Sequence, residues 1–137
     1  MPKILVAVNG SPTSEKALET AVTLAQSQNG RLVAVTVLDR SGNPHLARLT
    51  DDLETRVRAR LDEVLQSAMN FARSRGVSLV PTLREGHVAE AILACAEEEQ
   101  VDLLVLGAGS GHAAGRGLGS TADQVSNHCT CAVLLAK

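Results

Sequence analysis

The chain has 137 residues, of which 45% are hydrophobic and 20% charged, and its formal net charge is −2 at pH 7. Because the basic residues are spread along the chain, this charge balance argues against a nucleic-acid partner. Phe71 is the only aromatic residue, so the chain also lacks a stacking platform for single-stranded nucleic acid.

The length suits one globular domain, residues 1–137, with a buried core. Met1 is followed almost directly by an apolar strand, without the pattern of a signal peptide, and no apolar run is long enough to span a bilayer. We therefore expect a cytoplasmic protein that does not contact membranes. Three cysteines, an odd number, do not make a secreted disulfide framework and agree with a reducing compartment.

Five short apolar runs predict β-strands, and the centre of each run is an almost continuous series of Val, Leu, Ile or Ala. Such runs are typical of strands that are covered on both faces, as in a parallel sheet. The predicted strands are Lys3–Asn9, Arg31–Asp39, Val77–Arg84, Val101–Gly107 and Ala132–Ala136.

Helical periodicity occupies the four intervals between these strands. The first helix follows Ser14 and is expected to end near Asn29–Gly30, where the glycine would supply a left-handed C-terminal residue. The second, longer helix carries apolar residues every three or four positions over Leu46–Phe71 and ends before Gly76. The segment Arg40–His45, which precedes it, is expected to be a linker or lid.

The third predicted helix carries apolar residues over Ala91–Ala96 and ends in the acidic run Glu97–Glu99, which is expected to face solvent. The fourth begins near Ser120 and buries Ala122 and Val125. Strand and helix therefore alternate from one end of the chain to the other.

This alternation predicts an α/β fold, a three-layer α/β/α sandwich with a five-stranded parallel sheet that is doubly wound by right-handed crossovers. We expect a flavodoxin-like or Rossmann-like arrangement with the strand order 3-2-1-4-5, in which ligands bind where the order reverses between strands one and four. The loops that leave those two strands are Asn9–Ser14 and the stretch Gly107–Gly119. Two polar loops rich in small residues are thus expected to meet at one edge of the sheet.

Six of the eleven glycines lie in the stretch Gly107–Gly119, which follows an apolar strand and precedes Ser120 and Thr121. Glycine lets the backbone approach an anion, and the two hydroxyls stand at a helix N-terminus whose N–H groups have no intrahelical partner. A flexible surface loop is the plainer interpretation. The expected meeting of the two loops favours a phosphate site instead.

The residues of the chain resemble the universal stress protein family over nearly its whole length. Ile4–Ser11 and Ser14–Leu18 resemble the opening of the family pattern, Arg84–Ile92 and Asp102–Gly107 resemble its middle, and Gly119–Leu135 resembles its end. The resemblance implies the same five-stranded fold, a homodimer, and a small stress-response regulator without an established turnover reaction. Members of the family either bind nucleotides or lack the site.

The nucleotide-binding branch of that family is associated with the pattern G-x2-G-x9-G-[ST]. Gly107 and Gly119–Ser120 match the two ends of the pattern. Ser110 stands in place of the second glycine and the loop is one residue shorter, so Gly109 or Gly111 would have to substitute.

The opening loop also departs from that branch, because Asn9 stands where nucleotide binders typically have an aspartate that contacts the nucleoside. An amide keeps one acceptor and adds two donors, so hydrogen bonding to the nucleoside would survive at lower affinity. In this interpretation Val8 and Val37 flank the adenine, and Arg116 reaches a terminal phosphate. The expected ligand is ATP or another adenine nucleotide, with Mg²⁺ as an optional companion. The predicted nucleotide-binding residues are Val8, Asn9, Gly10, Ser11, Val37, Gly107, Gly109, Ser110, Gly111, Arg116, Gly119, Ser120 and Thr121.

Three alternatives stay open. One is a nucleotide-free interaction module with a degenerate pocket and an unidentified protein partner, motivated by Ser110, Asn9 and the shortened loop. A weak ATPase has less support, because neither loop carries a carboxylate to hold Mg²⁺ or orient water, and no catalytic residue is predicted. A zinc site at His128–Cys131 with His112 has poor ligand spacing, and cysteines at those positions commonly act as small hydrophobes. From the sequence, a redox-active cysteine pair has no more support than the zinc site.

The last predicted strand is expected at an edge of the sheet, where its unpaired N–H and C=O groups would promote aggregation. No inward charge or proline protects this strand. Pairing of two such edges about a two-fold axis would satisfy these groups and give a closed homodimer. The predicted interface residues are Val133, Leu134 and Leu135.

Overall fold

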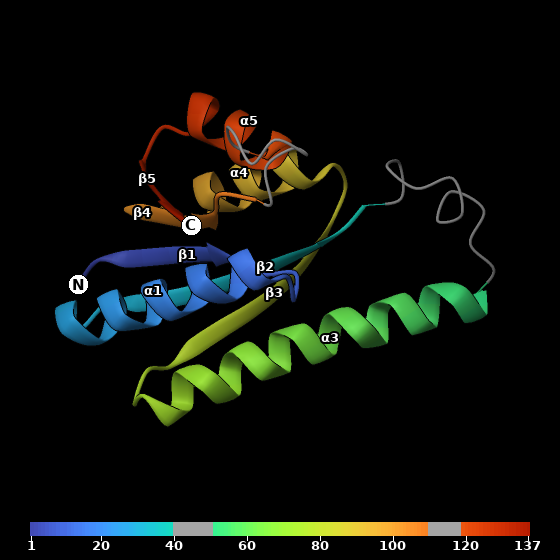
Figure 1. Ribbon diagram of the computed structural model, residues 1–137, viewed down its shortest axis with the longest axis horizontal. Helices are drawn as coiled ribbons and strands as arrows, with labels where there is room; N and C mark the ends of the chain where they lie inside the picture. Colours follow the sequence, from blue (N-terminus) through green and yellow to red (C-terminus); the bar gives the residue numbers. More distant parts are fainter. Residues whose placement is uncertain (40–50, 110–118) are drawn as a thin grey trace.

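Strands and helices alternate along the chain in the computed structural model, which describes residues 1–39, 51–109 and 119–137 (Figure 1). The elements in chain order are β1 (Lys3–Ala7), α1 (Pro12–Gln28), β2 (Arg31–Leu38), α3 (Asp51–Ser74), β3 (Leu79–Glu85), α4 (Val88–Glu98), β4 (Leu103–Gly107), α5 (Ser120–His128) and β5 (Ala132–Ala136).

The strands form one parallel sheet in the order β3-β2-β1-β4-β5, which confirms the predicted fold and strand order. This order is the Rossmann-like one, whereas a flavodoxin-like sheet has the order 2-1-3-4-5. Strand β1 lies at the centre, with Ile4 beside Leu32 of β2 on one side and beside Leu103 of β4 on the other. The winding direction reverses between β1 and β4. Strand β5 lies at an edge of the sheet, as predicted, and β3 forms the opposite edge.

Helices cover both faces of this sheet, and side chains that alternate along each strand supply two separate cores. Ile4 and Val6 of β1 belong to the core beneath α1 and α3, whereas Leu5 and Ala7 belong to the core beneath α4 and α5. Figure 1 shows α4 and α5 together above the strands and α3 below them. Burial on both faces is the physical reason why the strand sequences are continuously apolar.

Two predicted strands begin later than expected, because their first apolar residues complete the helix before them. The N–H of Val77 donates to the carbonyl of Ala72, and the N–H of Val101 donates to that of Ala96. Each bond spans the C-terminus of a helix in the pattern of a Schellman motif. Val77 and Val101 are therefore buried helix-capping residues, and β3 and β4 start at Leu79 and Leu103.

The end of α1 also differs from the prediction in one detail. The left-handed residue is Asn29, with φ 52°, and not Gly30. Gly30 is required for a different reason: a Cβ there would lie 2.9 Å from the carbonyl oxygen of Pro2. Asparagine tolerates the left-handed region better than most residues, which leaves the glycine free for this close approach.

The remaining helices agree with the sequence where the structure describes them. Ala122 and Val125 of α5 are buried, and the acidic run at the end of α4 faces solvent at Glu97 and Glu98. Helix α4 begins earlier than the apolar residues alone suggested, at Val88. The expected start of the second helix at Leu46 and the linker 40–45 lie outside the described residues. Within those residues, no helix is long and apolar enough to cross a membrane.

Candidate functional site

A cleft of about 700 Å³ opens where β1 and β4 end, at the point where the strand order reverses. Its walls come from the β1–α1 loop, the ends of β2 and β4, the first turns of α4 and α5, and Gly109. The lining residues are Ala7, Val8, Asn9, Ser11, Pro12, Thr13, Ser14, Val35, Val37, Val88, Ile92, Leu106, Gly107, Gly109, Gly119, Ser120, Thr121 and Ala122.

Hydrogen bonds within the β1–α1 loop fix the first wall of the cleft. Ser11 caps α1, because its Oγ accepts a bond from the N–H of Ser14 at 3.3 Å. The buried Ser14 hydroxyl donates to the Ser11 carbonyl at 3.2 Å and accepts from the N–H of Asn9 at 3.2 Å. Pro12 occupies the first helical position, where a missing N–H has no cost. These hydrogen bonds hold the β1–α1 loop in one conformation before any ligand binds.

Asn9 takes part in the same loop through its side chain. Its Oδ1 accepts a hydrogen bond from the N–H of Ser11 at 2.9 Å, which forms a local turn of the Asx type. The side chain is otherwise exposed at the cleft. Its NH₂ group is therefore the part of the amide that can donate to a ligand, while the oxygen already serves the loop.

Gly107, at the end of β4, is required by packing. A Cβ at this position would lie 2.8 Å from both the carbonyl carbon and the carbonyl oxygen of Thr13. Only glycine lets β4 end directly against the first turn of α1, and this contact places the two loops beside each other. The first glycine of the glycine-rich stretch is therefore explained by the fold without a ligand.

The N-terminus of α5 forms the opposite wall. The N–H of Gly119 donates to the Ala108 carbonyl at 2.8 Å, and a Cβ on Gly119 would lie 3.3 Å from the Cα of Gly109. These contacts close the base of the glycine-rich stretch. Gly119 occupies the N-cap position without a side chain to cap the helix, so the first turn of α5, with Ser120 and Thr121, presents its N–H groups at the cleft.

Nine of the thirteen predicted nucleotide-binding residues come together in this cleft, namely Val8, Asn9, Ser11, Val37, Gly107, Gly109, Gly119, Ser120 and Thr121. Gly10 does not line it. This glycine, with φ 83°, instead lines a second cavity of about 500 Å³ between α1 and α3 and lies beside Val64. The other three predicted residues, Ser110, Gly111 and Arg116, lie outside the described part of the chain.

The apolar part of the cleft is larger than the sequence suggested. Val8 is only 5% exposed, so it offers little surface. Val35 and Val37 of β2 and Val88 and Ile92 of α4 form a more extensive apolar wall on the other face of the sheet. The sequence analysis used Ile92 only as one of the apolar residues of the third predicted helix, and Val88 had no predicted role in the site. The useful signal was the position of Val88 directly after a strand-to-helix turn, at the edge of the sheet where ligands bind.

The described lining residues carry no charged side chain. Polarity in the cleft comes from hydroxyls, the Asn9 amide and backbone N–H groups at a helix N-terminus, a combination that suits an anion attached to an apolar group. Elsewhere too, the described residues include no cluster of three or more His, Cys, Asp or Glu side chains that could hold a metal ion.

Comparisons of the sequence and of the structure with known proteins point to the same family. The model of the universal stress protein family matches residues 1–137. A universal stress protein of Bacillus subtilis, YxiE, is 32% identical, and the alignment covers 98% of each chain. The solved structure of universal stress protein UspA from Lactobacillus plantarum superimposes with a TM-score of 0.86 at 27% identity, covering 99% of this chain and 97% of that one. A universal stress protein solved in complex with cAMP superimposes with a TM-score of 0.78 at 26% identity, with the same coverage.

Proposed function

This chain belongs to the universal stress protein family, and from that premise we propose that it is a cytoplasmic stress-response regulator that binds an adenine nucleotide in the cleft between β1 and β4. The observation that carries the proposal is the meeting of the β1–α1 loop and the first turn of α5 across one cleft with an apolar inner wall. That a related universal stress protein was solved with cAMP supports an adenine nucleotide as the ligand class.

The phosphates are assigned to the α5 side of the cleft. Backbone N–H groups in the first turn of α5 and the hydroxyls of Ser120 and Thr121 are the donors available there. Gly109, with φ 84°, lets the backbone pass close to an anion. Arg116, whose position is not described, is proposed to reach the terminal phosphate, with Ser110 and Gly111 contributing backbone donors.

The adenine ring is assigned to the apolar wall on the α4 side. Val35, Val37 and Val88 supply aliphatic surface, which can hold a flat ring by burial alone in a chain with a single aromatic residue. Asn9, between the two regions, is the donor for the ribose or the base.

No described residue that lines the cleft has a carboxylate, so a Mg²⁺ ion would be held by phosphate oxygens and water. For the same reason, no described residue of the cleft could act as a carboxylate base that activates a water molecule. We therefore propose binding and release of the nucleotide as the activity, without turnover.

The test is calorimetric titration with ATP, ADP and AMP, using the wild type and Ser120→Glu. A glutamate in the first turn of α5 favours the helix electrostatically, so a loss of binding would not reflect unfolding. The glutamate side chain would repel the phosphates of the nucleotide. We therefore expect ATP affinity to fall about tenfold or more, which is a loss of about 1.4 kcal/mol of binding free energy. Gln124→Glu, at an exposed site on the same helix outside the cleft lining, is the control and should leave affinity unchanged.

Asn9→Asp separates the proposal from its main alternative. An aspartate can accept the Ser11 N–H as the asparagine does, so the loop is retained while the free donor becomes an acceptor. Tighter binding by Asn9→Asp than by the wild type would show that the pocket is intact. If neither form gives heat with any nucleotide at millimolar concentration, the nucleotide-free interaction module replaces this proposal.

A further inference from the structure

Cys129 and Cys131 form a close pair of thiols at the turn between α5 and β5. Their Sγ atoms lie 3.1 Å apart, and both side chains are half-buried against the core beneath α4 and α5. The third cysteine, Cys95, is buried in α4. Two sulfur atoms are thus in contact at one point of the fold, partly open to small molecules.

Backbone contacts fix the positions of both cysteines. The N–H of Cys129 donates to the Val125 carbonyl at 2.9 Å, which fixes the first thiol at the end of α5. Cys131 directly precedes β5, whose first residue, Ala132, is in register with Leu103 of β4. The contact between the sulfurs is therefore set by the α5–β5 connection as well as by the short Cys-Thr-Cys spacing.

A covalent bond between the two sulfurs needs only a small movement. A disulfide has an S–S length of about 2.05 Å, so the sulfurs must approach by roughly 1 Å. A bound metal ion is a weaker interpretation, because structural zinc requires four ligands and the described residues offer no third His, Cys, Asp or Glu side chain to this pair.

We propose that Cys129 and Cys131 are a redox-active dithiol, which a low-molecular-weight disulfide of the glutathione class converts reversibly into an intramolecular disulfide. This site is separate from the nucleotide cleft, since neither cysteine lines it. The inference therefore does not depend on the proposed nucleotide.

The reaction proceeds by two exchanges. Burial raises the pKa of the Cys131 thiol to about 11, and its hydrogen bond with Cys129 adds to the shift, so Cys131 is protonated at neutral pH. In the proposed sequence Cys129, whose Sγ lies against that of Cys131, acts first. Its sulfur loses a proton and attacks one sulfur of the small disulfide, whose S–S bond breaks and releases one small thiol.

In the second exchange Cys131 loses its proton as its sulfur attacks the Sγ of Cys129. The mixed disulfide breaks and the second small thiol leaves. Two protein thiols are then oxidised to one disulfide, and one small disulfide is reduced to two thiols. A disulfide that encloses a single intervening residue, Thr130, is strained, and strained disulfides are the easily reduced ones, so we expect a switch and not a permanent crosslink.

The experiment equilibrates the full-length protein in mixtures of reduced and oxidised glutathione, blocks remaining thiols with iodoacetamide, and analyses tryptic peptides by mass spectrometry. Cleavage after Arg84 and Arg116 places Cys95 in peptide 85–116 and the pair in peptide 117–137. As the oxidised fraction rises, we expect peptide 117–137 to lose both alkylations together. The product should be two hydrogens lighter than the unalkylated dithiol form of the same peptide. Dithiothreitol should restore both alkylations.

Three variants complete the test. Cys95→Ser, the control, should oxidise like the wild type. In Cys129→Ser and in Cys131→Ser, oxidation should stop at a glutathione adduct on the remaining thiol of the pair. A wild-type protein that gives only glutathione adducts, only disulfide-linked dimers, or fully alkylated peptide 117–137 across the redox range would overturn the proposal, and this outcome requires no variant to fold.

Discussion

Thr36, in the middle of β2, is a buried hydroxyl in an otherwise apolar strand. It is 1% exposed, and among the described residues its Oγ1 has no hydrogen-bond partner. An unpaired buried hydroxyl costs about 1–3 kcal/mol of desolvation free energy that no bond recovers. Thr36 lies in register with Leu83 of β3, on the face of the sheet that α1 and α3 cover.

We predict that Thr36→Val raises the free energy of unfolding by about 1 kcal/mol, because valine has nearly the same shape and no polar atom to bury. Urea denaturation of both proteins measures the difference. Thr36→Ser is the matched variant, since it keeps the hydroxyl and loses the methyl group, and should be less stable than the wild type by about 1 kcal/mol. A valine variant less stable than the wild type would mean that the hydroxyl has a partner in solution.

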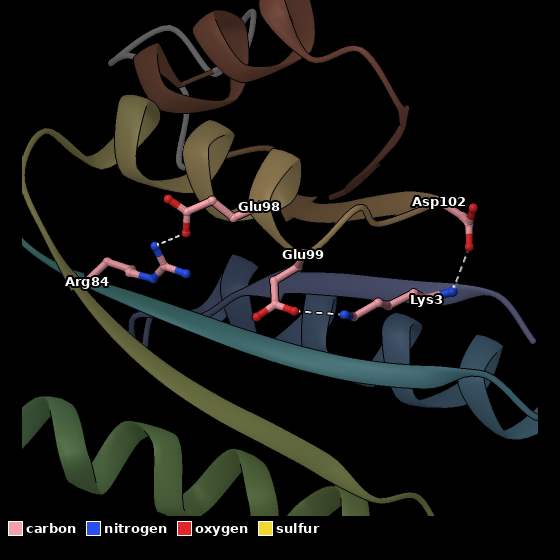
Figure 2. Close-up of polar contacts among 5 residues, drawn as sticks. All are labelled: Lys3, Arg84, Glu98, Glu99 and Asp102. Carbon is pink, nitrogen blue, oxygen red and sulfur yellow. Dashed lines mark hydrogen bonds and ion pairs between the residues drawn. The ribbon is translucent and has the colours of Figure 1, made fainter.

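Ion pairs connect two strands of the sheet to the C-terminal end of α4, the helix whose first turn lines the cleft. The ammonium of Lys3, at the start of β1, lies 2.7 Å from the Glu99 carboxylate. The backbone N–H of Lys3 donates to the Asp102 carboxylate (Figure 2). Arg84 of β3 pairs with Glu98 of α4 in the same region. These contacts connect β1 and β3 to the end of α4 and the start of β4. The bonds with Lys3 lower the pKa of the Glu99 carboxyl.

A double-mutant cycle of Lys3→Met and Glu99→Gln should give a coupling free energy of about 0.2–1 kcal/mol at pH 7, since both side chains are partly exposed. The pKa of Glu99 is lower in the folded than in the unfolded state, so the coupling is complete above the ordinary carboxyl range. It should be lost as the pH falls and Glu99 becomes protonated in the folded protein. Urea denaturation at several pH values measures it.

The same cycle for Arg84 and Glu98 is the comparison. The Glu98 side chain is 59% exposed, so solvent screens this pair more, and its coupling should be smaller. A Lys3–Glu99 coupling that stays constant down to pH 2 would contradict the assignment of the stabilisation to the Glu99 carboxylate.

The β5 edge of the sheet is the proposed dimer surface. Within the described part of the chain, strand β5 has a neighbouring strand on one side only, and Val133, Leu134 and Leu135 are half-buried within the protomer. We predict a homodimer in which two β5 edges meet about a two-fold axis, since this pairing would satisfy the exposed backbone groups and bury the remaining apolar surface.

Val133→Lys or Leu135→Asp should convert the dimer into monomer or aggregate, measured by light scattering, with circular dichroism to confirm that the protomer is folded. Val80→Lys is the control, because Val80 is 59% exposed on β3 at the other edge of the sheet. It should leave the dimer intact. A wild-type protein that stays monomeric at crystallisation concentrations would refute the proposal.

The layered fold could be predicted from patterns in the sequence. Every residue of Ile4–Val8 is buried, and a run without polar interruptions is stable as a strand only where helices cover both faces of the sheet. Alternation of such runs with helical periodicity predicts parallel strands joined by right-handed crossovers. The strand order, and with it the meeting of Asn9–Ser14 with the end of β4, came from the doubly wound arrangement expected for this alternation, and the structure has that order. These features are local patterns repeated along the chain.

Features that depend on close approach between distant segments could be recognised only in the three-dimensional structure. Gly107 is required because Thr13 lies against it, and Gly10 lines the cavity beside Val64 although its neighbours line the cleft. Val88 became part of the cleft wall because α4 packs over β2. No periodicity in the sequence encodes these distances, because each is set by how two elements pack after both have formed.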